Sequence, residues 1–168
     1  MRATPGRHAN NSLICRLLRP DPIYLERCWR CETTSGTEMA FYLDTSALVK
    51  LVVAESETVA LRTWLQGTDQ DFVSCDLART ELMRAVRRIV PDRALLARGV
   101  LDSVTLVEVT TAVFEAAGRL DPSALRSLDA IHLAAALDLG DDLDGLVTYD
   151  DGLAAAATAN GVAVFTPR

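Results

Sequence analysis

The sequence contains few aromatic residues and few cysteines. Phe, Trp and Tyr make up 5% of the 168 residues, so Ala, Leu and Val must supply most of the buried surface, as in helices that cover a sheet. Of the four cysteines, Cys28 and Cys31 form a C-x-x-C motif. A zinc ribbon would need a second such pair, and a thioredoxin-like motif would follow a strand rather than precede the core. We therefore expect reduced thiols without a metal or redox role.

Long hydrophobic runs and an excess of basic residues are also missing. No apolar run reaches the ~18 residues of a membrane span, and the N-terminus lacks the apolar stretch of a signal peptide, so we expect a cytoplasmic protein without a membrane segment. The net charge is −6: residues 1–38 hold six basic and four acidic residues, and residues 39–168 hold 11 basic and 19 acidic residues. General nucleic-acid binders carry a basic footprint. Any action on nucleic acid must therefore depend on local chemistry and on metal ions.

Two regions of the chain differ in composition. Residues 1–38 contain three prolines, a polar run from 33 to 38 and no sustained hydrophobic period, which predicts a poorly ordered leader. Met39 stands immediately before the first clear strand. We therefore expect one folded domain over residues 39–168, with Met39 as an alternative start of the native protein.

Strand and helix signals alternate from residue 41 onward. Short Val-, Leu- and Phe-rich runs predict strands over 41–43, 72–75, 105–109, 145–148 and 162–165. Helices are predicted between them, over 46–53, 57–66, 76–89, 92–102, 111–119, 127–138 and 151–159. Gly67, Gly140 and Gly161 follow helices at positions where a left-handed cap is common. This order predicts an α/β fold with an open five-stranded parallel sheet covered by helices on both faces.

Four acidic residues occupy positions that suit a site in such a sheet. Ligands bind beyond the carboxyl ends of parallel strands, where Asp44 and Asp150 directly follow predicted strands. Glu81 lies at the edge of the apolar arc of its helix. Asp129 lies in the first turn of a helix that is apolar almost all round, so we expect that helix, and Asp129 with it, to be buried. Together these carboxylates predict a hard-cation site, since Mg²⁺ and Mn²⁺ prefer oxygen ligands.

Each acid also has a simpler interpretation. Asp44 and Asp150 are candidate N-caps of the helices that follow them, and Asp151 is an alternative to Asp150. Glu81 is a candidate for ion pairs with Arg84 or Arg88 in its own helix. Asp129 is a candidate for stabilisation by first-turn amides.

The motifs as a set resemble those of the PIN-domain ribonucleases. In its size and in the detail of its motifs, the chain resembles the VapC toxins of bacterial toxin–antitoxin pairs. The resemblance covers residues 40–168 and rests on Leu43-Asp44-Thr45-Ser46-Ala47-Leu48, on Glu81 in an Arg-rich helix, on Leu128-Asp129-Ala130-Ile131-His132-Leu133-Ala134 and on Val147-Thr148-Tyr149-Asp150. The leader departs from the compact family pattern, which starts just before the first strand.

The resemblance implies a PIN-like nuclease domain over residues 39–168 with a catalytic and metal-binding cluster of Asp44, Glu81, Asp129 and Asp150. It implies an endoribonuclease toxin that hydrolyses RNA phosphodiester bonds through a water activated by carboxylate-bound Mg²⁺ or Mn²⁺. Ser46 and Thr148 would orient the acids or contact substrate. The expected partners are a small cognate antitoxin, an RNA substrate (tRNA, rRNA or mRNA) and a second copy in a homodimer.

Further basic residues and competing functions complete the sequence-based expectations. Arg84 and Arg88 stand nearest Glu81 on the basic side of their helix and are candidate phosphate contacts. His132 is expected to be a packing residue. A haloacid-dehalogenase-like hydrolase would need an acid at Ser46, and a receiver domain a further acid near Asp44. The remaining alternative is a catalytically weak RNA-binding or antitoxin-binding PIN module.

Overall fold

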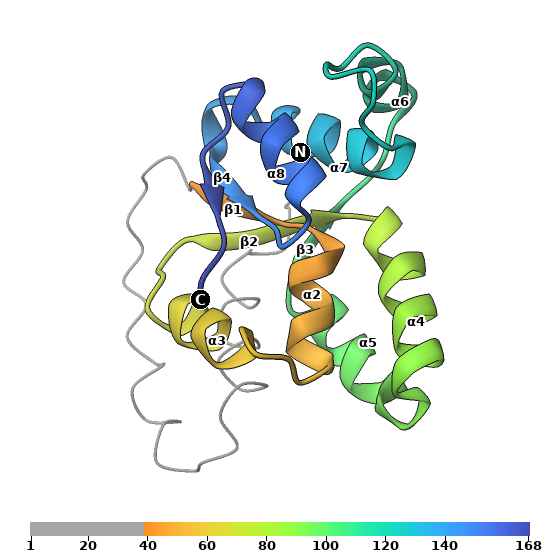
Figure 1. Ribbon diagram of the computed structural model, residues 1–168, viewed down its shortest axis with the longest axis vertical. Coiled ribbons are helices and arrows are strands. Elements are labelled where there is room, and N and C mark those ends of the chain that lie inside the picture. Colours follow the sequence, from red (N-terminus) through yellow and green to blue (C-terminus); the bar gives the residue numbers. More distant parts are fainter. Residues whose placement is uncertain (1–38) are drawn as a thin grey trace, which may run out of the picture.

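Figure 1 shows the computed structural model of the protein, which describes residues 39–168. The expected leader, including Cys28 and Cys31, lies outside these residues. The described chain forms one parallel sheet of five strands in the order β3-β2-β1-β4-β5, so the predicted fold class is confirmed. The strands are β1 (Ala40–Leu43), β2 (Asp71–Cys75), β3 (Thr105–Val107), β4 (Leu143–Val147) and β5 (Val164–Phe165).

Helices cover both faces of the sheet (Figure 1). One face packs against α2 (Thr45–Val52), α3 (Thr58–Gln66), α4 (Leu77–Ile89) and α5 (Ala94–Asp102). The other face packs against α6 (Thr111–Ala117), α7 (Ser127–Leu137) and α8 (Asp151–Ala159). Short 3-10 helices occupy Pro91–Arg93 and Gly140–Asp142. No helix among residues 39–168 is long and apolar enough to span a bilayer.

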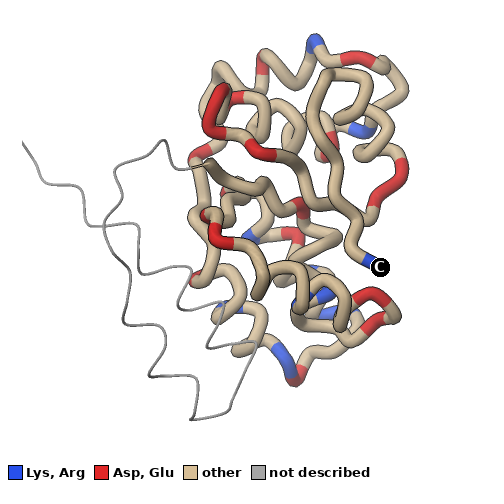
Figure 2. Tube along the Cα trace, turned by 90° about the vertical axis from the view of Figure 1, so that its left-hand side faces the viewer, with Lys and Arg blue, Asp and Glu red and all other residues tan. Residues whose placement is uncertain are grey.

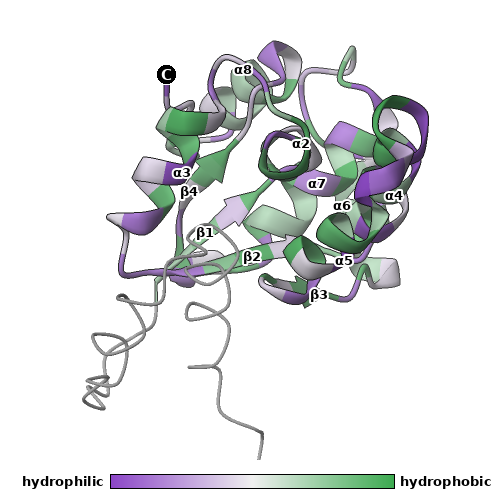
Figure 3. Cartoon of the chain, turned by 90° about the horizontal axis from the view of Figure 1, so that it is seen from below, coloured by the Kyte–Doolittle hydropathy of each residue, from purple (hydrophilic) through white to green (hydrophobic). Residues whose placement is uncertain are grey.

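The central strand β1 shows why this sequence forms a doubly covered sheet. All four of its residues are buried, and successive side chains point to opposite faces. Phe41 and Leu43 join the core under α2 to α5, whereas Ala40 and Tyr42 join the core under α6 to α8. β2 and β4 are likewise largely hydrophobic, green in Figure 3.

The register of β1 and β4 prepares the functional edge. Leu43 pairs with Val147, so Asp44 and Thr148 are the next residues on two neighbouring strands. The backbone N–H of Asp44 extends the pairing by donating to the Val147 carbonyl at 3.0 Å. On the far side of β4, Gly145 is required by close packing, since a Cβ there would lie 2.5 Å from the Phe165 ring.

The predicted element boundaries differ from the observed ones chiefly at the sheet edges. β3 ends at Val107 instead of 109, and β5 begins at Val164 instead of 162. The predicted helix 92–102 begins with the 3-10 turn after Val90 and becomes α-helical at Ala94. Gly140 and Gly161 have φ of 58° and 80°, as expected for left-handed caps. The prediction for Gly67 was wrong, because its φ is −90°.

Candidate active site

Asp44 is held at the end of β1 by donors from two neighbouring segments. Its Oδ2 accepts hydrogen bonds from Ser46 Oγ at 2.6 Å, from the Ser46 backbone N–H at 3.2 Å and from Thr148 Oγ1 at 3.0 Å. It is the N-cap of α2, so the capping alternative describes one of its roles. The carboxylate is nevertheless only 5% exposed, and Oδ1 lies 3.8 Å from His132 Nε2. Oδ2 of Asp44 is thus held by these donors, whereas Oδ1 faces His132, which also contacts Glu81.

The two predicted hydroxyl residues connect the strand ends. Ser46 Oγ accepts the backbone N–H of Tyr149 at 2.8 Å. Thr148 Oγ1 donates to Asp44 and accepts the backbone N–H of Asp150 at 3.1 Å. Because Thr148 is fully buried, it fixes the distance between two of the candidate ligands. The Ser46 hydroxyl is engaged with Asp44, which favours a positioning role over substrate contact.

Glu81 reaches the same site from α4. Its Oε2 accepts a hydrogen bond from Thr45 Oγ1 at 2.5 Å and lies 2.8 Å from His132 Nε2. These partners come from α2 and α7, so the interpretation of Glu81 as an intrahelical partner of Arg84 or Arg88 does not describe its contacts. Burial alone would raise the pKa of Glu81, but the hydrogen bonds from His132 and Thr45 outweigh it, and the pKa is lowered.

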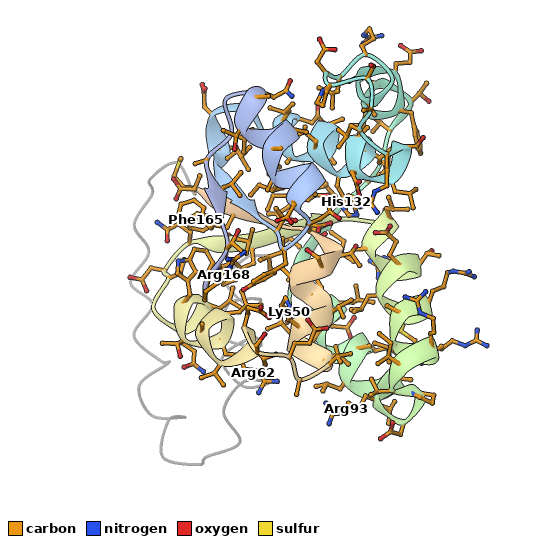
Figure 4. The ribbon with its side chains drawn as sticks, in the orientation of Figure 1. Lys50, Arg62, Arg93, His132, Phe165 and Arg168 are labelled. Atoms are coloured by element: carbon orange, nitrogen blue, oxygen red, sulfur yellow. The ribbon has the colours of Figure 1, made fainter. Side chains whose placement is uncertain are left out.

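His132 is the buried centre of this network. It belongs to α7 (labelled in Figure 4), its Nε2 lies 3.3 Å from Thr45 Oγ1 at the start of α2, and it is 1% exposed. Its Nδ1 is 2.8 Å from the Tyr42 hydroxyl, and Cys75 Sγ lies 3.7 Å away. Burial lowers the pKa of His132, but the hydrogen bonds with Cys75 and Glu81 and the charge of Asp44 raise it overall, to about 10. His132 is therefore both a packing residue and a positive charge beside Asp44 and Glu81.

Asp129 and Asp150 have a different partner, which the sequence analysis did not identify. Arg126 donates from Nε to Asp129 Oδ2 at 2.6 Å and from Nη2 to Asp150 Oδ2 at 2.6 Å. Asp150 also caps α8, because its Oδ1 accepts the Leu153 backbone N–H at 2.9 Å. Asp151 is exposed in the first turn of α8, so Asp150 is the residue that faces the site. The i, i+3 spacing of Arg126 and Asp129 is the signal that could have revealed the arginine.

The expected burial of the first turn of α7 was wrong. Leu128 is 47% exposed, and Asp129 is only partly buried, because this turn lies at the rim of the sheet and the fully packed residues begin at Ala130. Asp129 is stabilised by Arg126 as well as by its first-turn position. Burial raises the pKa of Asp129, and the negative charges of Asp150 and Asp44 add to this against the opposing effect of Arg126.

The four carboxylates therefore form two pairs that share one electrostatic field. We call Asp44 and Glu81 the core-held pair and Asp129 and Asp150 the arginine-held pair. Thr148 links Asp44 to Asp150, and the repulsion felt by Asp129 includes Asp44. Within residues 39–168, no three potential ligands are gathered closely enough to hold a metal ion in this arrangement. The donors are nevertheless all carboxylate and hydroxyl oxygens, the chemistry that suits Mg²⁺ or Mn²⁺, and Arg126 already places a cation between two of them.

A groove of about 730 Å³ adjoins Glu81 on the outer side of α4. Its lining residues are Leu77, Thr80, Glu81, Arg84, Ala85, Arg87, Arg88 and Leu128. The predicted phosphate contacts Arg84 and Arg88 thus border the same groove as a candidate ligand. The groove provides local positive charge on a chain whose acidic positions are spread widely (red in Figure 2). Arg93 is separate from it, because its Nη1 donates to the Val52 carbonyl at 2.7 Å.

Comparisons with known proteins find related sequences. The family model described as the PIN domain matches residues 41–159. The chain is 47% identical over 128 residues to ribonuclease VapC46 of Mycobacterium tuberculosis (strain ATCC 25618 / H37Rv), covering 76% of this chain and 98% of that protein. It is 42% identical over 130 residues to ribonuclease VapC47 of M. tuberculosis (strain CDC 1551 / Oshkosh), covering 75% and 96%.

A solved structure supports the fold alone. The crystal structure of M. tuberculosis VapC20, a sarcin–ricin loop cleaving toxin, superimposes with a TM-score of 0.63 at 17% identity, covering 76% of this chain and 99% of that one.

Proposed function

Because the chain belongs to the PIN-domain family, and within it to the VapC-type toxins, we propose that it is an endoribonuclease that hydrolyses RNA phosphodiester bonds with Mg²⁺ or Mn²⁺. The observation that supports the proposal is the arrangement of four carboxylates, from the end of β1, α4, α7 and the β4–α8 junction, along one edge of the sheet. Shared partners connect them: Thr148 donates to Asp44 and accepts the Asp150 backbone N–H, His132 lies against both Glu81 and Asp44, and Arg126 donates to Asp129 and Asp150.

The chain's own residues divide the work at this edge. Asp44, Glu81, Asp129 and Asp150 are the proposed ligands of the cation. When bound, a divalent cation would neutralise these carboxylates toward an RNA phosphate and make water a better nucleophile at neutral pH. Ser46 and Thr148 keep Asp44 Oδ2 in place, and Thr45 and His132 keep Glu81 Oε2 in place. Preorganised ligands of this kind reduce the reorganisation that cation and substrate binding require.

The groove beside Glu81 is the proposed path of the RNA. Arg84 and Arg88 would contact phosphates, which fixes the position of the strand without reading its sequence. The apolar floor formed by Leu77, Ala85 and Leu128 offers a surface for an unstacked base of a loop in tRNA, rRNA or mRNA.

Cleavage of total tRNA and rRNA by the antitoxin-free full chain tests the proposal. We expect discrete fragments with Mg²⁺ or Mn²⁺, none with EDTA, and none from Asp44→Asn, which keeps the shape of the side chain and removes its charge. Asp102→Asn, at an exposed residue at the end of α5, is the matched control and should cleave like wild type. Cleavage that persists in EDTA or in Asp44→Asn would refute the assigned site.

A second candidate function is an RNA-binding or antitoxin-binding module with little turnover. It is favoured by the engagement of Asp129 and Asp150 with Arg126 and of Glu81 with His132, which satisfies these carboxylates within the protein. Binding of RNA without metal-dependent fragments, by folded protein offered several RNA classes, would support this candidate.

We also propose that the protein acts in the cytoplasm, forms a homodimer and is inhibited by a small cognate antitoxin. An extended antitoxin segment lying in the groove beside Glu81 would block RNA and could place an arginine near the acids. Expression from the native operon should co-purify a small second protein, and light scattering of the isolated toxin should give twice the chain mass. A monomeric toxin that purifies alone would contradict these assignments.

A further inference from the structure

Arg126 occupies the oxygens that a cation at this site would need. It precedes α7 directly, and its side chain is 69% exposed. Its guanidinium donates to Oδ2 of Asp129 and to Oδ2 of Asp150, both at 2.6 Å, so one side chain bridges two of the four proposed ligands. Arg126 thus forms ion pairs with both members of the arginine-held pair.

Arg126 and a divalent cation cannot both lie between these two carboxylates. Each brings positive charge to the same Oδ2 atoms, and their mutual repulsion adds to the steric exclusion. We propose that Arg126 is a displaceable counter-charge: it holds Asp129 and Asp150 together in the cation-free protein, and it must leave both for the cation to bind. This inference rests on the proposed metal-dependent function.

The surroundings of Arg126 make its departure inexpensive. An exposed ion pair contributes little to stability, because the separated partners are well hydrated. His132, by contrast, is 1% exposed and has no solvent to move into. Leu128, two residues after Arg126, lines the groove, so a released guanidinium remains beside the proposed RNA path. Guanidinium groups bind phosphate oxygens in the same forked geometry as carboxylates.

Calorimetric titration of the full chain with Mn²⁺, without RNA, tests the inference. We expect Arg126→Gln to bind Mn²⁺ about 3- to 10-fold more tightly than wild type, since the two exposed ion pairs no longer have to be broken. Arg126→Lys, which keeps the charge but loses the fork, should fall between them. Arg79→Gln is the matched control, because Arg79 makes an exposed i, i+3 ion pair, at 2.9 Å, with Asp76, which is not one of the four proposed ligands. Its affinity should equal that of wild type.

The outcomes separate this inference from the proposed function. Mn²⁺ binding by wild type that is unchanged or weaker in Arg126→Gln would overturn the counter-charge role, show that Arg126 supports the acids, and leave the metal-dependent nuclease intact. Binding by Arg126→Gln alone would support the inference in its strongest form. No binding by either protein would overturn the inference and the proposed metal dependence together. Thermal unfolding of each variant confirms that it is folded.

Discussion

The two acidic pairs of the site are stabilised in opposite ways. The core-held pair, Asp44 and Glu81, receives hydrogen bonds from side chains that are mostly buried and cannot leave. The arginine-held pair, Asp129 and Asp150, is bridged by one exposed side chain. The core-held pair is therefore fixed by folding, whereas the arginine-held pair keeps a partner that can exchange. Both pairs serve one reaction in the proposed function, but only the first is built into the core.

The largest expected effect is the loss of RNA cleavage on substitution of an acid, and the loss should be equally large for either pair. Glu81→Gln and Asp150→Asn should each lower the rate of RNA cleavage by about a hundredfold or more, because stabilisation by a metal ion contributes several kcal/mol. Asn at 150 can still cap α8, so its effect should not come from unfolding. Initial rates on a fixed RNA measure both variants. A variant with near-normal rate would remove its pair from the active site.

Stability should separate the two pairs. His132→Phe should lower the free energy of unfolding by about 2–4 kcal/mol, because the Tyr42 hydroxyl and the Glu81 carboxylate both lose their hydrogen bond with His132. Urea unfolding followed by circular dichroism provides the measurement. A loss below half a kcal/mol would mean that the core-held pair is no more firmly fixed than the other.

Thr148 tests the link between the pairs. Thr148→Val keeps the shape of the side chain but removes the donor to Asp44 and the acceptor for the Asp150 N–H. We expect cleavage to fall about tenfold, the lower range for groups that orient metal ligands. The Mn²⁺ affinity should fall with it. An unchanged rate together with unchanged affinity would show that the two pairs act independently of Thr148.

The charge of His132 gives a pH-dependent effect. The pKa of His132 is raised in the folded protein to about 10, from an ordinary value of 6.5. The stabilisation from its charge is therefore fully present below pH 6.5 and is lost as the pH rises toward 10. The stability difference between wild type and His132→Phe should shrink over this interval in urea titrations. A difference that grows with pH would show that His132 is neutral in the folded protein.

The smallest expected effect concerns the arginine-held pair. Arg126→Gln should leave the urea midpoint unchanged within error, because exposed ion pairs often contribute nothing measurable. Arg79→Gln should behave alike. A clear loss of stability in Arg126→Gln alone would make the two pairs structurally equivalent.

The sequence was sufficient for the fold because its decisive signals are local. β1 reads as a buried strand from three consecutive residues, 41–43, and Asp44 and Asp150 follow from their places after strands. The edge strands were predicted too long: β3 ends at Val107, which pairs with the last residue of β2, and β5 pairs with β4 only from Val164, although hydrophobic residues precede it. Thr45 and the partners of His132 were missed for another reason. Thr45 meets Glu81 36 residues away, and His132 meets Tyr42 90 residues away, distances over which no periodicity carries information.

The central position of β1 has a consequence for when the protein becomes active. Asp44 is aligned by Thr148, 104 residues later in the chain, and β1 completes its pairing only when β4 has joined the sheet. Contacts between such distant segments form late in folding, because a long loop must close first. A nascent chain on the ribosome has no aligned Asp44 until β4 and Thr148 have been synthesised. During most of its translation, the protein therefore lacks a complete site. The proposed antitoxin, if made alongside it, has that interval in which to accumulate.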